Sequence, residues 1–301
     1  MSKTIDVLIL TEARYEHPQE VNWYVQNILT EDGLVQTALE KRGCRVERVD
    51  WNRDDVDWAS AKCALFRTTW DYFDKYPVFR AWLDRVEPVL PLINSAFLAR
   101  WNTDKHYLQD LEKAGIHIAP TLFVELGDTR SLEDLHTETG WEHTVLKPVV
   151  SGAGRHTYQL KAGDWSKYEA VYRDLIREEA MMLQPFQHDV VRTGELALMV
   201  VNGAVTHAVK KVAKPGDFRV QDDFGGTVHG HVPTAEEVRF AEAAVRACPE
   251  EPLYARVDII RDNAGALAVA ELELIEPEMW FREYPPAADL LAEAIVEKLR
   301  G

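Results

Sequence analysis

Three carboxylates near the C-terminal end of the chain stand at spacings that place them on one face of a two-stranded sheet. Asp258 lies in the apolar run Leu253–Arg261, and a short polar segment leads into a second run, Ala266–Glu276. Glu271 and Glu273 are two residues apart in that second run, so both carboxylates project from one face. Carboxylates gathered in such apolar strands repel one another and lose hydration, a conflict that a divalent cation resolves. All-oxygen ligation predicts Mg²⁺ or Mn²⁺, and the alternative is a solvated sheet face.

A lysine inside an apolar strand predicts an anion as its partner. Lys147 stands in the strand that begins at Thr144, and lysine is seldom buried without a partner. Ser151, Gly152 and Gly154 follow directly, and small residues let backbone N–H groups approach a phosphate. The segment matches neither the Gly-x4-Gly-Lys-Ser/Thr loop nor the dinucleotide fingerprint. We therefore expect a flap over a triphosphate, the alternative being an ordinary flexible turn.

Composition limits the class of partner. The chain has 301 residues, of which 46% are hydrophobic, and a formal net charge of −16. This charge argues against nucleic acid or an anionic membrane surface as partner. The three cysteines, Cys44, Cys63 and Cys248, form no framework and read as reduced thiols of a cytoplasmic protein. No apolar run approaches a transmembrane helix, and no signal peptide is recognised.

The elements that must position these residues begin with strand, helix and strand. We expect strands at residues 5–10, 45–49 and 63–66 and a helix over residues 22–42, a βαβ pattern typical of an open α/β domain. Ligands of such sheets lie beyond the carboxyl ends of the strands. Arg67, Thr68 and Tyr72 follow the third strand and are therefore candidate substrate contacts, unless they belong to an ordinary loop.

The rest of the chain alternates between helices and antiparallel strands. Helices are expected at residues 77–87, 100–114, 165–179, 235–247 and 286–300, and strands at 122–125 and 181–186. Asn202-Gly203 between two apolar runs predicts a hairpin of residues 196–201 with 204–211. Residues 222–231 read as a glycine-rich loop. Lys210, Lys211 and Arg219 gather basic charge in a chain that is otherwise acidic.

In this order, the residues resemble the ATP-grasp superfamily. The motifs that carry the resemblance are Lys105, Lys147, the Gly152/Gly154 loop, Gln184 and the three carboxylates. It implies an α/β and α+β protein with the ATP-grasp fold: an N-terminal open α/β domain (1–100), a lid (101–185) and a C-terminal α+β domain with the metal site (186–301). Arg67-Thr-Thr-Trp-Asp-Tyr, Trp101-Asn-Thr-Asp-Lys and Glu271-Leu-Glu-Leu-Ile-Glu-Pro look most like the D-cycloserine ligase group. Many relatives have Asn where this chain has Glu273, but glutamate keeps an oxygen ligand.

The resemblance also implies roles for individual residues. Lysines 105 and 147 would hold the nucleotide phosphates under the flap of Ser151, Gly152 and Gly154. The backbone after Gln184, at Pro185 and Phe186, would meet the adenine, with Glu195 on the ribose side and Lys210 as a further contact. Asp258, Glu271 and Glu273 would hold two divalent ions, Mg²⁺ or Mn²⁺. Lys147, Arg256 and Arg219 would assist phosphoryl transfer, and the expected substrate contacts are Arg67, Thr68, Tyr72, Glu276 and Arg282.

The implied reaction is an ATP-dependent ligation of a carboxylate to a nitrogen through an acyl phosphate, with no protein nucleophile. In the cycloserine group the nitrogen belongs to the same amino-acid-like molecule, O-ureido-D-serine, and the product is D-cycloserine. Three alternatives remain open: a ligase that joins two molecules, as glutathione synthetases do, an ATP-binding protein without catalysis, and a metal hydrolase. The resemblance also allows a homodimer.

Overall fold

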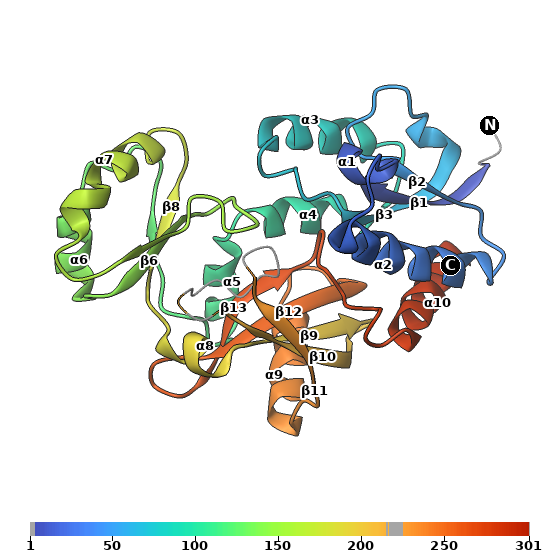
Figure 1. Cartoon of the computed structure of the whole chain (residues 1–301). Coiled ribbons are helices and arrows are strands. Elements are labelled where there is room, and N and C mark those ends of the chain that lie inside the picture. Colours follow the sequence, from blue (N-terminus) through green and yellow to red (C-terminus); the bar gives the residue numbers. More distant parts are fainter. Residues whose placement is uncertain (1–3, 215, 217–224, 301) are drawn as a thin grey trace.

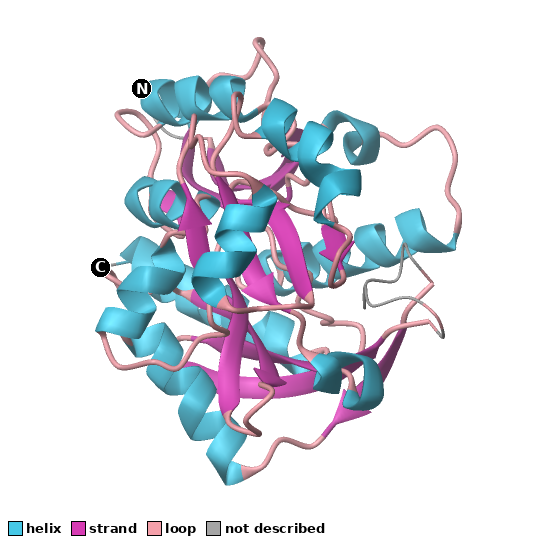
Figure 2. Ribbon diagram, turned by 90° about the vertical axis from the view of Figure 1, so that its left-hand side faces the viewer, coloured by secondary structure: helices cyan, strands magenta, loops and turns pink. Residues whose placement is uncertain are grey.

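The computed structural model describes residues 4–214, 216 and 225–300, which build three β-sheets with helices packed around them (Figures 1 and 2). Each sheet comes from a successive part of the chain. The sheet from the first part lies at the upper right of Figure 1, the second at the left and the third below. The division into domains at residues 100 and 185 stays a prediction.

The first sheet is parallel, with strand order β2-β1-β3-β4. Its apolar runs are buried on both sides, as expected of parallel strands between helices. Asn22 begins the long helix, because its side chain accepts a hydrogen bond of 2.9 Å from the N–H of Val25. The bounds are β1 Ile5–Thr11, α1 Ala13–Glu16, α2 Trp23–Glu40, β2 Val46–Asp50, η1 Trp58–Ser60, β3 Ala61–Thr68, α3 Tyr76–Val86 and β4 Leu92–Ile93.

The second sheet is antiparallel, with strand order β5-β8-β6-β7. Helices α6 and α7 pack on each other and close its core. The sequence reasoning missed α6, although Ser131 and Asp134 form a capping box and Gly140 ends the helix in the left-handed conformation. The bounds are β5 Leu122–Val124, α6 Leu132–Thr139, β6 Thr144–Pro148, β7 Tyr158–Leu160, α7 Trp165–Leu175 and β8 Met181–Pro185.

The third sheet is antiparallel, with strand order β11-β10-β9-β12-β13. Helix α9 covers one face together with α4 and α5, whose apolar residues share one buried cluster with β9, β12 and β13. The bounds are α4 Ala96–Thr103, α5 Tyr107–Lys113, α8 His188–Thr193, β9 Glu195–Val201, β10 Ala204–Val212, β11 Thr227–His231, α9 Ala235–Arg246, β12 Tyr254–Arg261, β13 Leu267–Glu273 and α10 Pro286–Arg300.

Two expectations about elements were wrong. Residues 227–231, expected within a loop, form β11, because pairing with β10 satisfies their backbone groups; residues 222–224 lie outside the described residues. The helix expected over 100–114 is two helices, because the backbone of Asp104 between them is extended. This break places Lys105 at the junction, where its N–H donates to the carbonyl of Val149 at 2.9 Å.

Helix α10 returns to the first part of the chain and packs against α2 (Figure 1). Apolar residues of β1, α2, β9 and α10 form a single buried cluster. Glu31 of α2 is almost fully buried, and its carboxylate accepts the N–H groups of Phe281 and Arg282 at 3.0 and 2.9 Å. These hydrogen bonds therefore fix the segment that follows β13 to helix α2.

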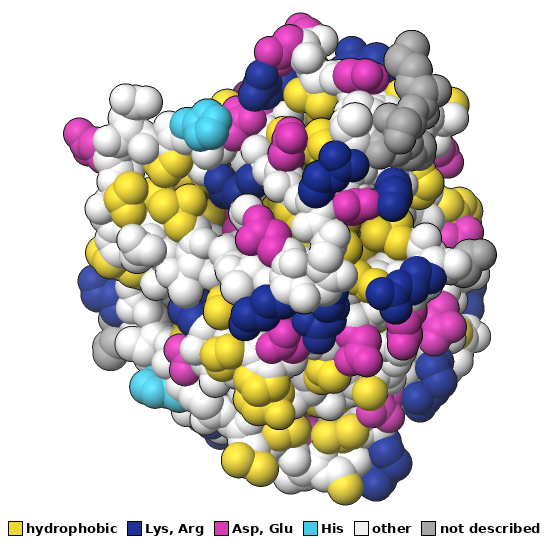
Figure 3. Space-filling model, turned by 90° about the vertical axis from the view of Figure 1, so that its right-hand side faces the viewer, with side chains coloured by type: hydrophobic (Ala, Val, Ile, Leu, Met, Phe, Trp, Pro, Cys, Tyr) yellow, Lys and Arg dark blue, Asp and Glu magenta, His cyan; other side chains and the backbone are white. Residues whose placement is uncertain are grey.

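Charges of both signs are mixed on the surface of this acidic chain. On the face shown in Figure 3, Lys and Arg side chains are interspersed with Asp and Glu rather than gathered into one basic field. No disulfide joins any two of Cys44, Cys63 and Cys248. No helix among the described residues combines the length and apolar character that a membrane crossing requires.

Candidate active site

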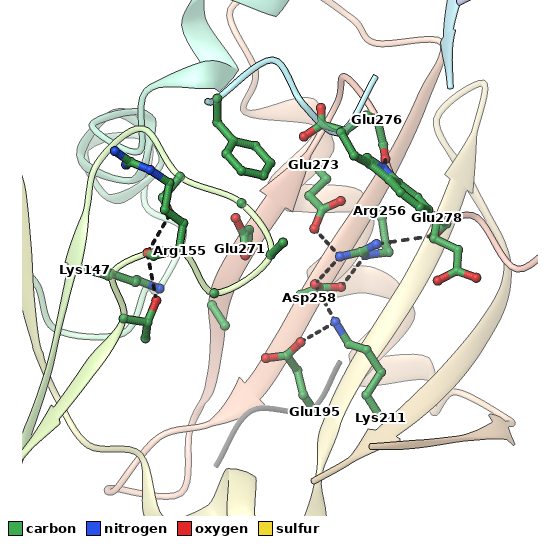
Figure 4. A pocket seen from close by; sticks show the side chains of 18 of the residues that line it. Lys147, Arg155, Glu195, Lys211, Arg256, Asp258, Glu271, Glu273, Glu276 and Glu278 are labelled. Carbon is green, nitrogen blue, oxygen red and sulfur yellow. Dashed lines mark hydrogen bonds and ion pairs between the residues drawn. The ribbon is translucent and has the colours of Figure 1, made fainter. Parts of the chain in front are cut away.

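A cavity of about 920 Å³ is lined by strands of the second and third sheets and by the segments that follow β1 and β3 of the first sheet (Figure 4). Most of the predicted site residues line it. They are Tyr72, Lys105, Lys147, Ser151, Gly152, Gly154, Gln184, Pro185, Phe186, Glu195, Arg256, Asp258, Glu271, Glu273 and Glu276. Residues that the sequence separates by up to two thirds of the chain thus face one space.

The three predicted metal ligands stand together on the β12–β13 hairpin. Asp258 lies opposite Glu271, and Arg256 lies opposite Glu273. A register shift directly after Asp258 leaves Ala270 as an extra residue on β13, and such a bulge re-aims the side chains beside it. One oxygen from each of the three carboxylates lies within 4.8 Å of the others. Among residues 4–214, 216 and 225–300 this is the only such group of candidate ligands, and its all-oxygen donor set fits Mg²⁺ or Mn²⁺.

Two cations hold the buried carboxylate of this group. Arg256 donates two hydrogen bonds of 2.9 Å to Asp258, in the two-pronged geometry that suits a guanidinium. The same guanidinium contacts Glu273 on the neighbouring strand. Lys211 of β10 donates to Asp258 at 2.7 Å and pairs with Glu195 at 2.5 Å (Figure 4). Two cations of its own sheet therefore offset part of the negative charge of the acidic cluster.

A third cation joins this group of carboxylates to the loop of residues 151–155, which we call the phosphate loop because of its expected role. Lys105 pairs with Glu271 at 3.1 Å, and its Nζ donates to the carbonyl of Ser151 at 2.5 Å. Lys147 approaches the same space from β6 of the second sheet (Figure 4). Burial lowers the pKa of Lys147, and the charge of Glu271 only partly offsets that effect. An anion bound here would offset the cost of burying this ammonium.

Burial also sets the protonation of the acidic groups. It raises the pKa of Glu273 to about 7, an effect that the charges of Asp258 and Glu271 reinforce and that Arg256 opposes. It raises the pKa of Glu276 to about 8, with a further contribution from the charge of Glu273. For Asp258, burial alone would raise the pKa, but Arg256 and Lys211 together hold it below the ordinary value.

The end of the cavity that the sequence predicts to meet the adenine is built by the end of β8 and the segment that joins β8 to α8. Gln184 donates to Thr121 at 2.8 Å, while Pro185, Phe186 and Gln187 line the cavity. Asn263, in the turn between β12 and β13, clamps this segment. Its side chain donates to the carbonyl of Phe186 at 2.9 Å and accepts from the N–H of His188 at 3.1 Å, and its own N–H donates to Gln187 at 3.0 Å.

The structure corrects the choice between two neighbouring lysines. Lys210, predicted as a nucleotide contact, is absent from the cavity wall, whereas Lys211 lies on it. Successive residues of a strand point to opposite faces, so a one-residue error moves the side chain to the other side of the sheet. Sequence reasoning saw basic charge at both positions and had no buried neighbour to fix the face.

Three predicted substrate contacts are also absent from the cavity wall. Arg67 is 1% exposed and lies within 3.7 Å of Glu31 and 3.5 Å of Asp32. Thr68 bonds to Thr11 at 2.6 Å. Arg282 pairs with Glu31 at 3.2 Å and with Glu278 at 2.5 Å. Arg67, which also donates to the carbonyl of Pro277 at 3.2 Å, and Arg282 join α2 to the C-terminal segment instead, while Thr68 joins β3 to β1. Arg219 lies outside the described residues.

The sequence reasoning missed an aromatic end of the cavity. Trp23, Tyr24 and Trp70 line it together with Tyr15, and their rings are in contact. These side chains come from the segments after β1 and β3. The rule that ligands lie beyond the carboxyl ends of parallel strands selected Tyr72, and applied to β1 it would also have selected Tyr15.

Two sequence profiles match the chain. The profile described as the N-terminal domain of D-cycloserine synthetase DcsG matches residues 7–94. The profile described as the ATP-grasp domain of prokaryotic glutathione synthetase matches residues 114–270. The second match contains the phosphate loop and most of the β12–β13 hairpin.

Individual relatives agree with these profiles. The chain is 30% identical to the cycloserine biosynthesis protein DcsG of Streptomyces lavendulae over an alignment 286 positions long, which covers 87% of this chain and 92% of that protein. The crystal structure of D-cycloserine synthetase DcsG superimposes with a TM-score of 0.85 at 25% identity and covers 97% of this chain and 99% of that one. The D-alanine–D-alanine ligase of Bacillus anthracis shares the fold, with a TM-score of 0.66 at 15% identity over 98% of this chain and 97% of that one.

Proposed function

From the premise that this chain belongs to the ATP-grasp ligases, in the family of D-cycloserine synthetase DcsG, we propose that it cyclises a small amino-acid-like substrate. The resemblance and the ATP-grasp fold predicted from the sequence are confirmed by the same matches. The protein is an ADP-forming ligase that makes a carbon–nitrogen bond, and its fold uses ATP and a divalent metal. The substrate proposed is a compound such as O-ureido-D-serine, with D-cycloserine as the product.

One observation carries the proposal. The carboxylates of Asp258, Glu271 and Glu273 lie within 4.8 Å of one another on the same cavity wall as Arg256, and the phosphate loop is tied to this wall through Lys105. Phosphoryl transfer needs little covalent chemistry from a protein but much positioning and charge stabilisation. This arrangement of cations and carboxylates supports both requirements.

The proposed reaction has two steps. An oxygen of the substrate carboxylate attacks the γ-phosphorus of ATP, and ADP leaves. The nitrogen then attacks the acyl carbon, inorganic phosphate leaves and the nitrogen loses a proton. When both groups belong to one molecule, the second step closes a ring, and holding the two ends together supplies much of the rate. With O-ureido-D-serine the ring nitrogen carries a carbamoyl group, which water must remove as CO2 and NH3 to leave D-cycloserine.

The residues are assigned to these steps by their positions. Lys105, Lys147 and Lys211 hold the phosphates, and Arg256 stabilises the charge that develops between them and the acyl group. Asp258, Glu271 and Glu273 would hold two ions, Mg²⁺ or Mn²⁺, which would supply positive charge to offset the charge that develops on the phosphates. Tyr72 and Glu276 contact the acceptor substrate at the aromatic end of the cavity.

An ADP-release assay with Mg²⁺ and a panel of amino acids, O-ureido-D-serine and O-ureido-L-serine included, tests the proposal when it is followed by product mass. A cyclising enzyme releases ADP with one organic substrate and gives a ring lighter than that substrate by one water. With O-ureido-D-serine, hydrolysis must also remove the carbamoyl group from the ring as CO2 and NH3, so the product mass is that of D-cycloserine. Absence of ADP with every single substrate would overturn cyclisation.

A ligase that joins two molecules is the second candidate. The match of residues 114–270 to the glutathione synthetase profile favours it, as does a cavity of about 920 Å³. Such an enzyme would need a separate amine before ADP appears, and its product would carry both substrates. A homodimer and a cytoplasmic location stay predictions.

A further inference from the structure

The loop over the phosphate half of the cavity, residues 151–155, touches the first part of the chain at a point where only glycine fits. A methyl group on the Cα of Gly152 would lie 2.6 Å from Cε1 and 2.8 Å from Cδ1 of the Phe73 ring. Carbon atoms in contact normally stand about 3.5–4.0 Å apart. The φ angle of Gly152 lies outside the left-handed region, so close approach, rather than backbone conformation, explains the glycine here.

A second contact joins the same two segments. The guanidinium of Arg155 holds Glu179 with hydrogen bonds of 2.8 and 2.9 Å, and its Nε lies 3.6 Å from Asp74 (Figure 4 shows Arg155 above the cavity). Glu179 lies two residues before Met181, the first residue of β8 in the second sheet. Arg155 therefore bridges the second sheet and the segment that carries Phe73.

The segment from Trp70 to Asp74 is itself anchored at its other end. The indole of Trp70 donates to the carbonyl of Glu276 at 2.9 Å. The Tyr72 ring is buried and packs edge-on against Phe73, with ring centroids 5.5 Å apart. The contacts of Trp70 and Tyr72 therefore hold in place the segment that carries Phe73.

Hydrogen bonds also link the loop of residues 151–155 to itself and to Lys105 at the carboxylate group. The hydroxyl of Ser151 donates to the carbonyl of Arg155 at 3.0 Å, which closes the loop on itself. The carbonyl of Ser151 accepts from Lys105, the lysine that pairs with Glu271. A displacement at Gly152 is therefore passed to the groups that face the nucleotide phosphates.

Building on the proposed function, we propose that Phe73 and Asp74 are positioning residues that hold the loop of residues 151–155 closed over the phosphates of ATP. Phe73 fills the space beside Gly152, and Asp74 adds an ion pair to Arg155. Neither touches the reacting atoms. Because the loop closes on bound nucleotide and Phe73 stabilises the closed position, nucleotide affinity depends on the ring.

The test is a double-mutant cycle read by binding. Phe73→Ala, Phe73→Leu, Gly152→Ala and the double variant Phe73→Ala/Gly152→Ala are titrated with Mg²⁺ and the β,γ-imido analogue of ATP by calorimetry. Amide hydrogen exchange of the peptide covering residues 151–157 is followed in parallel. A melting curve of each variant establishes that it is folded.

Phe73→Ala and Gly152→Ala should each weaken the analogue by roughly fivefold or more, the lower end of ordinary coupling between sites. Loop exchange should rise in both. Phe73→Leu, which keeps bulk, should stay close to the parent. The double variant should be no weaker than Phe73→Ala alone, because the added methyl group then meets no ring. Asp74→Asn should have a smaller effect, since Glu179 still holds Arg155.

Unchanged affinity and exchange in Phe73→Ala, or strictly additive losses in the double variant, would overturn the inference. If Phe73→Ala does not fold, Phe73→Val, which also lacks the Cδ1 and Cε1 atoms, gives the same comparison alone and combined with Gly152→Ala. None of these readouts requires turnover. A failure of the proposed function, seen as no ADP release with any substrate, is therefore distinct from a failure of this inference.

Discussion

Asp258 is the most heavily paired carboxylate of the site, and its neighbours show how a small group of residues balances charge. Arg256 and Lys211 hold it from two sides, while Glu271 relies on Lys105 and Glu273 relies on Arg256. Removing one member of such a network leaves the others buried without a partner, and that cost exceeds the worth of one exposed ion pair.

Glu271→Gln should abolish most ADP production without loss of fold. The amide keeps the shape of the side chain but removes a ligand charge and the ion pair with Lys105. We expect a fall in kcat of roughly 10²- to 10³-fold, as for other single groups that stabilise developing charge. The measurement is ADP release with Mg·ATP and the best substrate of the panel. Glu297→Gln, on the exposed face of α10, is the control; normal turnover in Glu271→Gln would contradict the metal assignment.

Glu276 should make stability depend on pH. Burial raises its pKa from the ordinary 4.5 to about 8. Below pH 4.5 the carboxyl is protonated in both the folded and the unfolded chain, and its neutral form suits the buried site. As pH rises toward 8, the unfolded state loses the proton first, so the free energy of unfolding falls. Urea titrations from pH 5 to 8 should show this decline, and Glu276→Gln should flatten it; equal slopes in both proteins would contradict the assignment.

The candidate site could be predicted where residue type alone decides chemistry. Three carboxylates at strand spacing and a lysine inside an apolar strand are unusual enough to select Asp258, Glu271, Glu273 and Lys147 without a structure. Arg67 was also predicted as a substrate contact from its residue type and its place after a strand. In the structure it lies in a buried group of ion pairs with Glu31 and Asp32. Whether such an arginine faces a cavity or a buried ion pair depends on carboxylates far away in the sequence. The spacing of residues along the chain does not reveal these partners.

At the scale of elements, strand alternation separates Lys211 from Lys210. Lys211→Met should weaken binding of Mg·ATP roughly tenfold or more, because it removes charged hydrogen bonds of about 1.5–3 kcal/mol each. Lys210→Met is a matched control on the opposite face of β10 and should bind nucleotide normally. Calorimetric titration of both variants is the measurement. A larger loss of nucleotide affinity in Lys210→Met than in Lys211→Met would support Lys210 as the nucleotide contact, as predicted from the sequence.

Asn263 should matter for the nucleotide although it lies in a surface turn. Its side chain ties the segment after β8 to the β12–β13 turn by two hydrogen bonds. Asn263→Ala removes both, each worth about 0.5–1.5 kcal/mol, and leaves the adenine-facing backbone free to shift. The KM for ATP should rise several-fold while kcat changes little. Asn202→Ala, in the turn between β9 and β10, serves as the control, and an equal KM in both variants would contradict the role.

The elements themselves were predictable to different degrees. Hairpins with an Asn-Gly or Asp-Asn-Ala-Gly turn and long apolar strands were identified, because turn chemistry and burial agree there. Helix α6 and strand β11 were missed: the first is short and polar-faced, and the second exists only through pairing with β10. The break at Asp104 was also missed, since a helical pattern continues across it and tertiary contacts of Lys105 end the helix.

At the scale of the molecule, α10 joins the last part of the chain to the first. Leu291 is fully buried in the cluster shared by β1, α2 and β9. Leu291→Ala should lower the free energy of unfolding by about 2–5 kcal/mol, and the first and third sheets should lose structure together. Chemical denaturation followed by tryptophan fluorescence and far-UV circular dichroism gives both readings. Leu290→Ala, at an exposed neighbour, should change little; two separate transitions in the parent would contradict the shared core.

The seat of α10 on α2 has a consequence for biogenesis. A ribosome makes α2 and β1 early, but the helix that covers them emerges only after more than two hundred further residues. Until then the nascent N-terminal segment presents an uncovered apolar surface, the kind that chaperones bind. Its final compaction must therefore wait until α10 has left the exit tunnel. Ribosome-bound chains stalled before Pro286 should be cut by protease far more readily than chains stalled after a linker that lets α10 leave the tunnel.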